Sequence, residues 1–278
     1  MEGSAMQPQP EQPLIDVRGL VKKYGDFAAV TEISLQVRPG EVFVLLGPNG
    51  AGKTTTIRML MGILQPTAGR ASVAGLDCFA DRAEVMRHVG YLPDEPIFYD
   101  FLRGREIVHF VGEMHGLSRR ETDEHAGALI EQLDLADAME EYAVNYSRGM
   151  KKKLALVCAM FHEPRLLIMD EPTNGLDPLT TRRLHGIIRA HAEAGKSVFL
   201  STHLLDQAEK LCDRVGILYR GRLAAMGQLA ELRGQASADS TLEEIFFAVT
   251  APDTESAGSA PAVEPGQNAP PAAKEPDA

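Results

Sequence analysis

The sequence has no long apolar run, and we expect no signal peptide at its N-terminus. A membrane-spanning helix needs about 18 consecutive apolar residues, whereas the longest candidate, residues 154–161, is much shorter and follows three lysines. Residues 1–13 are rich in Gln and Pro and lack the apolar region of a signal peptide. We therefore expect a chain that is soluble on its own.

Cysteine and basic residues are also scarce. Cys78, Cys158 and Cys212 are scattered and have no Cys-x-x-Cys spacing, so they indicate neither a disulfide framework nor a zinc site. We expect buried thiols in a protein of the reducing cytosol. The chain has 28 basic and 39 acidic residues, and its net charge of −11 disfavours a nucleic-acid partner, which usually requires a basic face.

What the sequence does contain is a phosphate-binding loop. Residues 47–54 match Gly-x-x-x-x-Gly-Lys-Ser/Thr, in which glycines let backbone N–H groups approach a phosphate. Lys53 is expected to reach the β- and γ-phosphates, and the Thr54 hydroxyl to hold Mg²⁺. The predicted nucleotide-binding residues of this loop are Gly47, Pro48, Asn49, Gly50, Ala51, Gly52, Lys53, Thr54 and Thr55.

The flanks of the loop support this interpretation. The apolar run at residues 42–46 predicts a strand buried on both faces. After the loop, apolar residues at positions 57, 60, 61 and 64 predict one face of a helix. The order strand, loop, helix is the one that phosphate binding requires, although it does not separate kinases, GTPases, motors and transport ATPases.

A second apolar run, residues 166–169, leads directly into Asp170 and Glu171. Ligand chemistry in open α/β sheets gathers at the carboxyl ends of strands. Asp170 suits coordination of Mg²⁺. Glu171 suits polarisation of an attacking water as a general base.

The remaining pattern predicts an α/β fold. A helix between strands at residues 166–169 and 197–201 indicates a parallel sheet. Alternation at residues 33–37 predicts an antiparallel-type strand, and residues 14–17 and 71–74 are further strand candidates. Residues 101–161 are predicted to be helical, with a stripe of Ile107, Phe110, Val111 and Met114 and a capping box opened by Ser118.

Several motifs resemble those of the ATPase subunits of ATP-binding cassette (ABC) transporters. Residues 170–178, Asp-Glu-Pro-Thr-Asn-Gly-Leu-Asp-Pro, resemble the Walker B motif and D-loop, and residues 146–150, Tyr-Ser-Arg-Gly-Met, resemble the signature motif. His203 follows a strand as the switch histidine of the family does. Tyr24 matches the aromatic residue that stacks on adenine, and Asp94 stands at the Q-loop position. The resemblance covers about residues 14–247 in the expected order.

This resemblance implies a P-loop NTPase core with a mainly parallel sheet, an antiparallel β subdomain and an inserted α-helical subdomain. It divides the chain into a flexible leader at 1–13, an ABC ATPase domain at 14–235 with the helical subdomain at about 95–163, and a C-terminal helical extension at 236–250. Residues 251–278, rich in Pro and Ala, are expected to form a disordered acidic tail.

The resemblance also implies roles for single residues. Glu171, His203 and Lys53 are the catalytic candidates, and Thr54, Asp170 and Asp94 the metal candidates. Further nucleotide contacts are implied for Tyr24, Ser147, Gly149 and Asp177, with the signature binding the γ-phosphate held by a second subunit.

Two departures from the family pattern stand out. Asp94 replaces the usual Gln, and it is shorter and negatively charged. The signature keeps Ser147 and Gly149 and resembles the variant of drug, antibiotic and polysaccharide exporters. The lysines at 151–153 that follow it are predicted to form a solvated helix face.

The sequence thus predicts an ATP- and Mg²⁺-dependent ATPase that powers a separate membrane permease, for export. We expect it in the cytoplasm, bound to the inner face of the cell membrane through that permease, as a homodimer or as a heterodimer with a second ABC ATPase. A non-transport ABC ATPase of DNA repair or translation is the alternative, although the gap between residues 94 and 147 is short and the chain has one nucleotide core. A small-molecule P-loop kinase would have no use for the Ser147 motif or His203.

Overall fold

A computed structural model describes residues 12–236 and 241–251 of the chain. Its centre is a six-stranded sheet in the order β10-β9-β3-β8-β7-β6. All neighbours pair in parallel except β10, which runs antiparallel to β9 at the edge. The strands are β3 (Val42–Leu46), β6 (Val89–Leu92), β7 (Leu166–Asp170), β8 (Ser197–Thr202), β9 (Arg214–Tyr219) and β10 (Arg222–Gly227). The predicted parallel sheet is confirmed.

A second sheet is antiparallel, in the order β2-β1-β4-β5. It consists of β1 (Ile15–Tyr24), β2 (Phe27–Val37), β4 (Ala68–Val73) and β5 (Leu76–Asp77). β1 and β2 extend well beyond the predicted segments, because they form one long hairpin whose far end is exposed and lacks strict alternation. Gly25 turns this hairpin with a φ of 57°.

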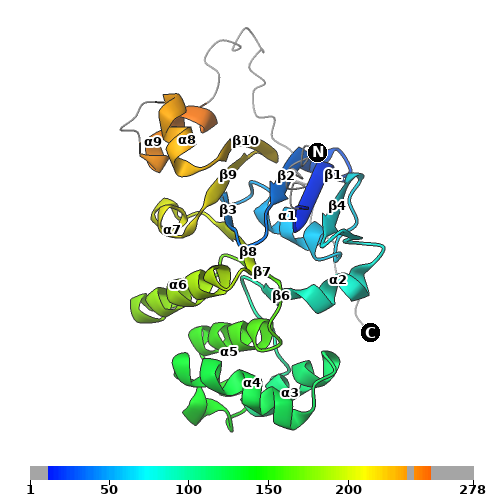
Figure 1. The fold of residues 1–278 in the computed structure, drawn as a ribbon, viewed down its shortest axis with the longest axis vertical. Helices are drawn as coiled ribbons and strands as arrows, with labels where there is room; N and C mark the ends of the chain where they lie inside the picture. The colour runs from blue at the N-terminus through cyan, green and yellow to red at the C-terminus, as the bar shows by residue number, and fades with distance from the viewer. Residues whose placement is uncertain (1–11, 237–240, 252–278) are drawn as a thin grey trace, which may run out of the picture.

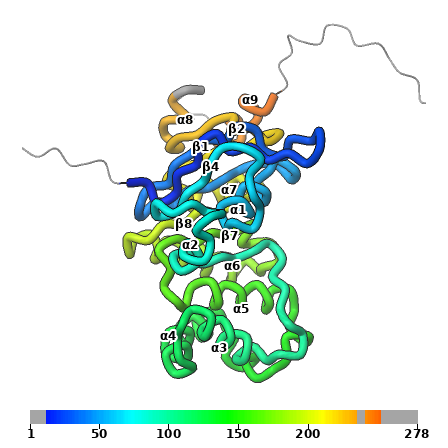
Figure 2. The backbone as a smooth tube through the Cα atoms, turned by 90° about the vertical axis from the view of Figure 1, so that its right-hand side faces the viewer, coloured from blue at the N-terminus to red at the C-terminus, as the bar shows by residue number. Residues whose placement is uncertain are grey.

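The helices cover the remaining faces. They are α1 (Lys53–Leu60), α2 (Arg82–His88), α3 (Gly104–Met114), α4 (Arg119–Gln132), α5 (Arg148–Met160), α6 (Pro178–Glu193), α7 (Leu205–Leu211), α8 (Leu229–Ala236) and α9 (Leu242–Thr250), with short 3₁₀ turns η1 (Ala136–Ala138) and η2 (Ala143–Asn145). In Figures 1 and 2, α3, α4 and α5 gather at the end of the molecule away from β1, β2 and β4. The predicted fold class, a parallel core with an antiparallel sheet and a helical region, is confirmed.

Strand β3 explains why its sequence is apolar without interruption. Val44 and Leu46 face one core, which they share with α3, α5 and α6. Phe43 and Leu45 face a second core, shared with α1 and the antiparallel sheet. Because a strand directs alternate side chains to opposite faces, a strand between two cores needs apolar residues at every position.

The predicted stripe on α3 is partly wrong. Phe110 and Met114 are exposed, whereas Ile107 and Val108 are buried. A Cβ atom added at Gly112 would lie 2.1 Å from Oγ1 of Thr122, so α4 approaches the backbone of α3 at this glycine. This close approach turns the face of α3 that carries Val108 and Gly112 inward. The predicted capping box at Ser118 is confirmed, since its side chain accepts a hydrogen bond from the backbone N–H of Glu121.

Two findings bear on the absences noted in the sequence. Across residues 12–236 and 241–251, no helix combines the length and apolar character that a membrane crossing needs. All three cysteines are free thiols, with Cys78 and Cys212 buried and Cys158 partly buried. Burial raises the pKa of Cys78 to about 12. The predicted leader and tail lie, apart from residues 12, 13 and 251, outside the described residues.

Candidate functional site

The carboxyl ends of three neighbouring strands bring the sequence motifs together. The phosphate loop follows β3, Asp170 ends β7, and His203 follows β8. The register pairs Leu46 of β3 with Thr202 of β8, and Asp170 of β7 with Ser201 of β8. Parallel strands in register end at one edge of the sheet, so motifs far apart in the chain meet there.

The loop requires glycine at two positions. Gly52 precedes α1 with a φ of 106°, and a Cβ atom added there would lie 2.6 Å from the carbonyl oxygen of Ala29. A Cβ atom at Gly47 would lie 2.3 Å from the carbonyl oxygen of Leu218. No side chain in the described part of the chain caps the N-terminus of α1, so its first N–H groups are left for a ligand. An uncapped helix start behind a glycine loop fits a phosphate group.

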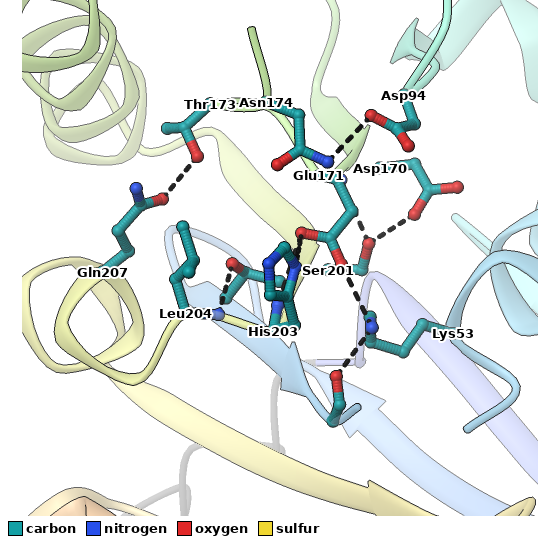
Figure 3. Close-up of polar contacts among 12 residues, drawn as sticks. Lys53, Asp94, Asp170, Glu171, Thr173, Asn174, Ser201, His203, Leu204 and Gln207 are labelled. Atoms are coloured by element: carbon teal, nitrogen blue, oxygen red, sulfur yellow. Dashed lines mark hydrogen bonds and ion pairs between the residues drawn. The ribbon is translucent and has the colours of Figure 1, made fainter. Parts of the chain in front are cut away.

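Lys53 lies in the first turn of α1 and is buried. Its Nζ donates hydrogen bonds to the carbonyl oxygens of Gly47, at 2.7 Å, and Pro48, at 3.2 Å. The same atom forms an ion pair with Oε1 of Glu171 at 3.0 Å (Figure 3). The ammonium group is therefore held between the loop and the carboxylate at the end of β7.

Glu171 is held on two sides. Its Oε2 lies 2.9 Å from Nδ1 of His203 and accepts a hydrogen bond from the His203 backbone N–H at 3.3 Å (Figure 3). Because an ionised carboxylate only accepts hydrogen bonds, the contact with Nδ1 requires a proton on that nitrogen. The backbone of Glu171 has a φ of 45°, which L-residues seldom adopt, and its N–H donates to the carbonyl oxygen of Ser201 at 3.1 Å.

Asp170 is more deeply buried than Glu171. It is 1% exposed, and its Oδ1 accepts a hydrogen bond from the Ser201 hydroxyl at 2.5 Å. The two adjacent acids thus differ in environment. Asp170 is fixed within the sheet edge, whereas the Glu171 carboxylate is flanked by a cation and an imidazole.

A pocket of about 310 Å³ opens beside these groups. It is lined by Tyr24, Phe27, Ala29, Asn49, Gly50, Gly52, Lys53, Thr54, Thr55, Asp94 and Glu171. Tyr24 and Phe27 face each other across the β1–β2 turn, and both are exposed aromatic residues. Phe27 was not among the predicted residues. The sequence feature that could have indicated it is a second aromatic residue directly after the turn.

The prediction for the lysines at 151–153 is wrong for Lys152. Lys152 is 1% exposed, and its Nζ donates hydrogen bonds to the carbonyl oxygens of Asp94 at 2.7 Å and Glu171 at 2.9 Å. Lys152 lies four positions before the buried Leu156, on the same face of α5, but a run of three lysines does not indicate the partners that would bury one of them. Burial lowers the pKa of Lys152, and the Asp94 carboxylate opposes that shift.

Three predicted residues lie away from this pocket. Ser147 is the N-cap of α5, and its Oγ accepts a hydrogen bond from the backbone N–H of Met150 at 3.2 Å. Gly149 packs against the turn at Gly175. Asp177 caps α6 by accepting the backbone N–H of Thr180 at 2.9 Å, and hydrogen bonds from Thr180 lower the pKa of Asp177. Ser147 and Asp177 are both exposed.

The chain is similar in sequence to ATP-binding proteins of ABC transporters. The family model described as "ABC transporter" matches residues 30–174. The probable multidrug ABC transporter ATP-binding protein YbhF of Escherichia coli is 38% identical over 86% of this chain, and this chain spans only 42% of YbhF. The daunorubicin resistance ATP-binding protein DrrA3 of Streptomyces coeruleorubidus is 37% identical, with 81% of this chain and 71% of DrrA3 covered.

Solved structures resemble the fold in the same way. The solved structure of an ATP-binding subunit of an ABC transporter has a TM-score of 0.81 and 32% sequence identity to this chain. The match covers 85% of this chain and 99% of the solved chain. A nucleotide-free ATP-binding cassette from an ABC transporter has a TM-score of 0.69 at 23% identity, with coverage of 84% and 99%. The second likeness concerns the fold alone.

Proposed function

This chain belongs to the ABC transporter family, and from that premise we propose that it binds and hydrolyses ATP to power a separate membrane permease, for export. The observation that carries the proposal is the contact of Lys53, Glu171 and His203 at the mouth of the phosphate loop. Relatives named for multidrug and daunorubicin resistance support export as the direction.

The residues of the pocket divide into binding and chemical roles. The α1 N-terminus and Lys53 would hold the β- and γ-phosphates. The backbone N–H groups and the ammonium group can donate charge-assisted hydrogen bonds to phosphate oxygens. Tyr24 would stack on the base. When bound, Mg²⁺ supplies charge neutralisation at the phosphate oxygens. Thr54 and Asp170 would hold it, with Asp94 at the pocket wall.

Glu171 would take a proton from the attacking water. Its carboxylate lies at the pocket wall and contacts His203, which keeps one oxygen in a fixed direction. Lys53 offsets negative charge that develops on the transferred group. The chain thus contributes positioning, proton acceptance and electrostatic stabilisation.

We propose that Ser147, Gly149 and Asp177 contact ATP bound by a second subunit, in a homodimer or in a heterodimer with another ABC ATPase. Ser147 and Asp177 are exposed and do not line the pocket of their own chain, which supports this role. The N-terminus of α5 offers N–H groups to an anion from outside the chain.

The permease would dock beside the helical region. Ile97 and Phe101 are 92% and 73% exposed, and Tyr99 and Val144 are exposed beside them, with the Val144 N–H bonded to the carbonyl oxygen of Asp100. Contiguous exposed apolar side chains mark interaction surfaces. The segment from Asp94 to Tyr99 starts at the pocket, so it can carry movement from there to the permease. The chain would then lie at the cytoplasmic face of the membrane.

Purification from the native host tests the proposed partner. The tagged full chain should copurify from detergent with a polytopic membrane protein. Ile97→Asp with Phe101→Asp should lose that partner, because charge replaces two exposed apolar contacts. Ile63→Asp, at an isoleucine 51% exposed after α1, is the matched control and should retain it. Copurification of the wild type with DNA or ribosomes alone would contradict the transport proposal.

Replacing Tyr24 by Ala should weaken ATP binding. Stacking of a base on an aromatic ring contributes about 1–3 kcal/mol, which corresponds to about a 5- to 150-fold rise in Kd. Titration with a non-hydrolysable ATP analogue measures it, with Phe27→Ala as the matched comparison across the turn. A larger loss in Phe27→Ala would move the base to β2 and reject the assignment of Tyr24.

A further inference from the structure

Lys152 places a charged group in the interior, where an unpaired ammonium is strongly unfavourable. It is 1% exposed and belongs to α5, the helix that Ser147 caps. Hydrogen bonds to charged groups stabilise such a site only where the partners are well placed. The partners of Lys152 therefore indicate why it is buried.

Those partners come from two other motifs. Nζ of Lys152 donates to the carbonyl oxygen of Asp94 at 2.7 Å and to that of Glu171 at 2.9 Å, and lies 3.5 Å from Oδ1 of Asp94. An ammonium has three N–H donors; the two carbonyl oxygens accept hydrogen bonds from Nζ, and the carboxylate oxygen lies at ion-pair distance. Asn174, in the turn after β7, donates from Nδ2 to the same Oδ1 at 3.1 Å (Figure 3).

The contact at Glu171 falls on a strained residue. Glu171 has a φ of 45°, and its own carbonyl oxygen accepts from Lys152. Non-glycine residues persist in this region of φ only where surrounding contacts hold them. Lys152 is thus one of the groups that determine where the Glu171 side chain points.

Lys152 and Asp94 carry opposite charges and form an ion pair. A neutral side chain at position 94 would remove the carboxylate that lies 3.5 Å from Nζ of Lys152. Here Asp94 adds a negative charge near Asp170 and Glu171, and the Lys152 ammonium beside it supplies the opposite charge. The Lys152 side chain is 2% exposed and the Asp94 side chain 37% exposed, so only the ammonium is fully buried, and the attraction lies between that of a buried pair and that of a pair in water.

We propose that Lys152 is a positioning residue for ATP hydrolysis, one that ties the signature helix to Asp94 and to the backbone of Glu171. This inference rests on the proposed ATPase function. Lys152 does not line the pocket, so it acts on Glu171 and Asp94 rather than on the nucleotide. Its loss should reduce turnover and leave nucleotide affinity nearly unchanged.

The test compares Lys152→Met with Lys153→Met, a change at the next position of the same helix. Lys152→Met should lower kcat about 10- to 100-fold, because displacement of a catalytic group by about 1 Å has effects of this size. The Kd of a non-hydrolysable ATP analogue should change by less than about threefold, since phosphate contacts come from α1. Lys153→Met should match the wild type in both measurements.

A double-mutant cycle tests the charge match. Lys152→Gln leaves Asp94 without its cation, Asp94→Gln leaves Lys152 without its carboxylate, and the double variant makes both positions neutral. The double variant should recover kcat relative to Lys152→Gln alone, because the two residues interact directly. Additive losses would show that the two residues act independently and would overturn the pairing.

Hydrogen exchange separates this inference from the proposed function, because it needs no ATP. Lys152→Met should speed amide exchange at residues 94–99 and 171–174 relative to Lys153→Met. Unchanged kcat and exchange in Lys152→Met, with an active wild type, would overturn the role of Lys152 alone. A wild-type chain without ATP turnover would refute the proposed function and the hydrolytic role of Lys152, and exchange would then decide whether the link itself exists.

Discussion

Replacement of Glu171 by Gln is expected to lower the turnover number for ATP about 10²- to 10⁴-fold, the usual contribution of a general base. Gln keeps the size of the side chain and can still contact His203, but it cannot take a proton from water. ATP binding should persist, because the proposed phosphate contacts are those of Lys53 and the uncapped α1 N-terminus rather than of Glu171. Steady-state kinetics gives the turnover, and titration with ATP gives the affinity.

The matched control for this change is Glu41→Gln. Glu41 is also a buried carboxylate in an ion pair, with Arg214 at 3.1 Å. It directly precedes β3, however, and so lies at the amino end of that strand, away from the pocket. Glu41→Gln should lower the melting temperature and leave kcat near the wild-type value. Equal turnover in Glu171→Gln and wild type would remove Glu171 from the role of base. Trapping of a stable ATP-bound dimer by Glu171→Gln is expected if a second subunit completes the site.

Replacement of Lys53 by Ala is expected to weaken ATP binding about 10- to 150-fold, since a hydrogen bond to a charged group contributes about 1.5–3 kcal/mol. Turnover should fall as well, because Lys53 is the cation nearest the predicted phosphate position. The variant also leaves Oε1 of Glu171 without its ion-pair partner. Its melting temperature should therefore fall, and binding has to be measured well below that temperature.

Lys196→Ala serves as the comparison for Lys53→Ala. Lys196 forms a surface ion pair with Glu163 and lies away from the pocket lining. Surface pairs contribute little to stability, so Lys196→Ala should keep both the affinity and the melting temperature of the wild type. Unchanged affinity in a folded Lys53→Ala variant would mean that the phosphate site lies elsewhere.

The Glu171 and Lys53 variants test different steps. Glu171→Gln separates chemistry from binding, whereas Lys53→Ala impairs both. Lys53 and Glu171 contact each other directly, so their effects are not expected to add. A double variant that loses no more turnover than Glu171→Gln would indicate that the two groups act as one unit.

Much of the site was predictable because its motifs are local. The loop at residues 47–54 and the acids at the end of the 166–169 run each combine a buried strand with the residues that follow it. Parallel strands end at a common edge, so the meeting of Lys53, Glu171 and His203 follows once the strands are recognised. The tertiary structure adds their distances and partners.

Other features could not be read from local patterns. The inward face of α3 depends on the close approach of α4 at Gly112, not on the apolar spacing of α3 itself. Lys152 belongs to a run of three lysines, which is typical of a solvated surface, and its burial depends on the carbonyl oxygens of Asp94 and Glu171, in the segments that follow β6 and β7. Phe27 enters the pocket because the β1–β2 hairpin places it opposite Tyr24.

The sequence by itself determined the fold class and the phosphate-binding chemistry, because both depend on residue types at short, fixed spacings along the chain. Only the tertiary structure decided which charged groups are buried together, which helix faces turn inward, and that Ser147 and Asp177 lie outside the pocket. The physical reason is that burial and charge pairing depend on what other segments bring to a position. That information is spread over the whole chain and is not contained in any one motif.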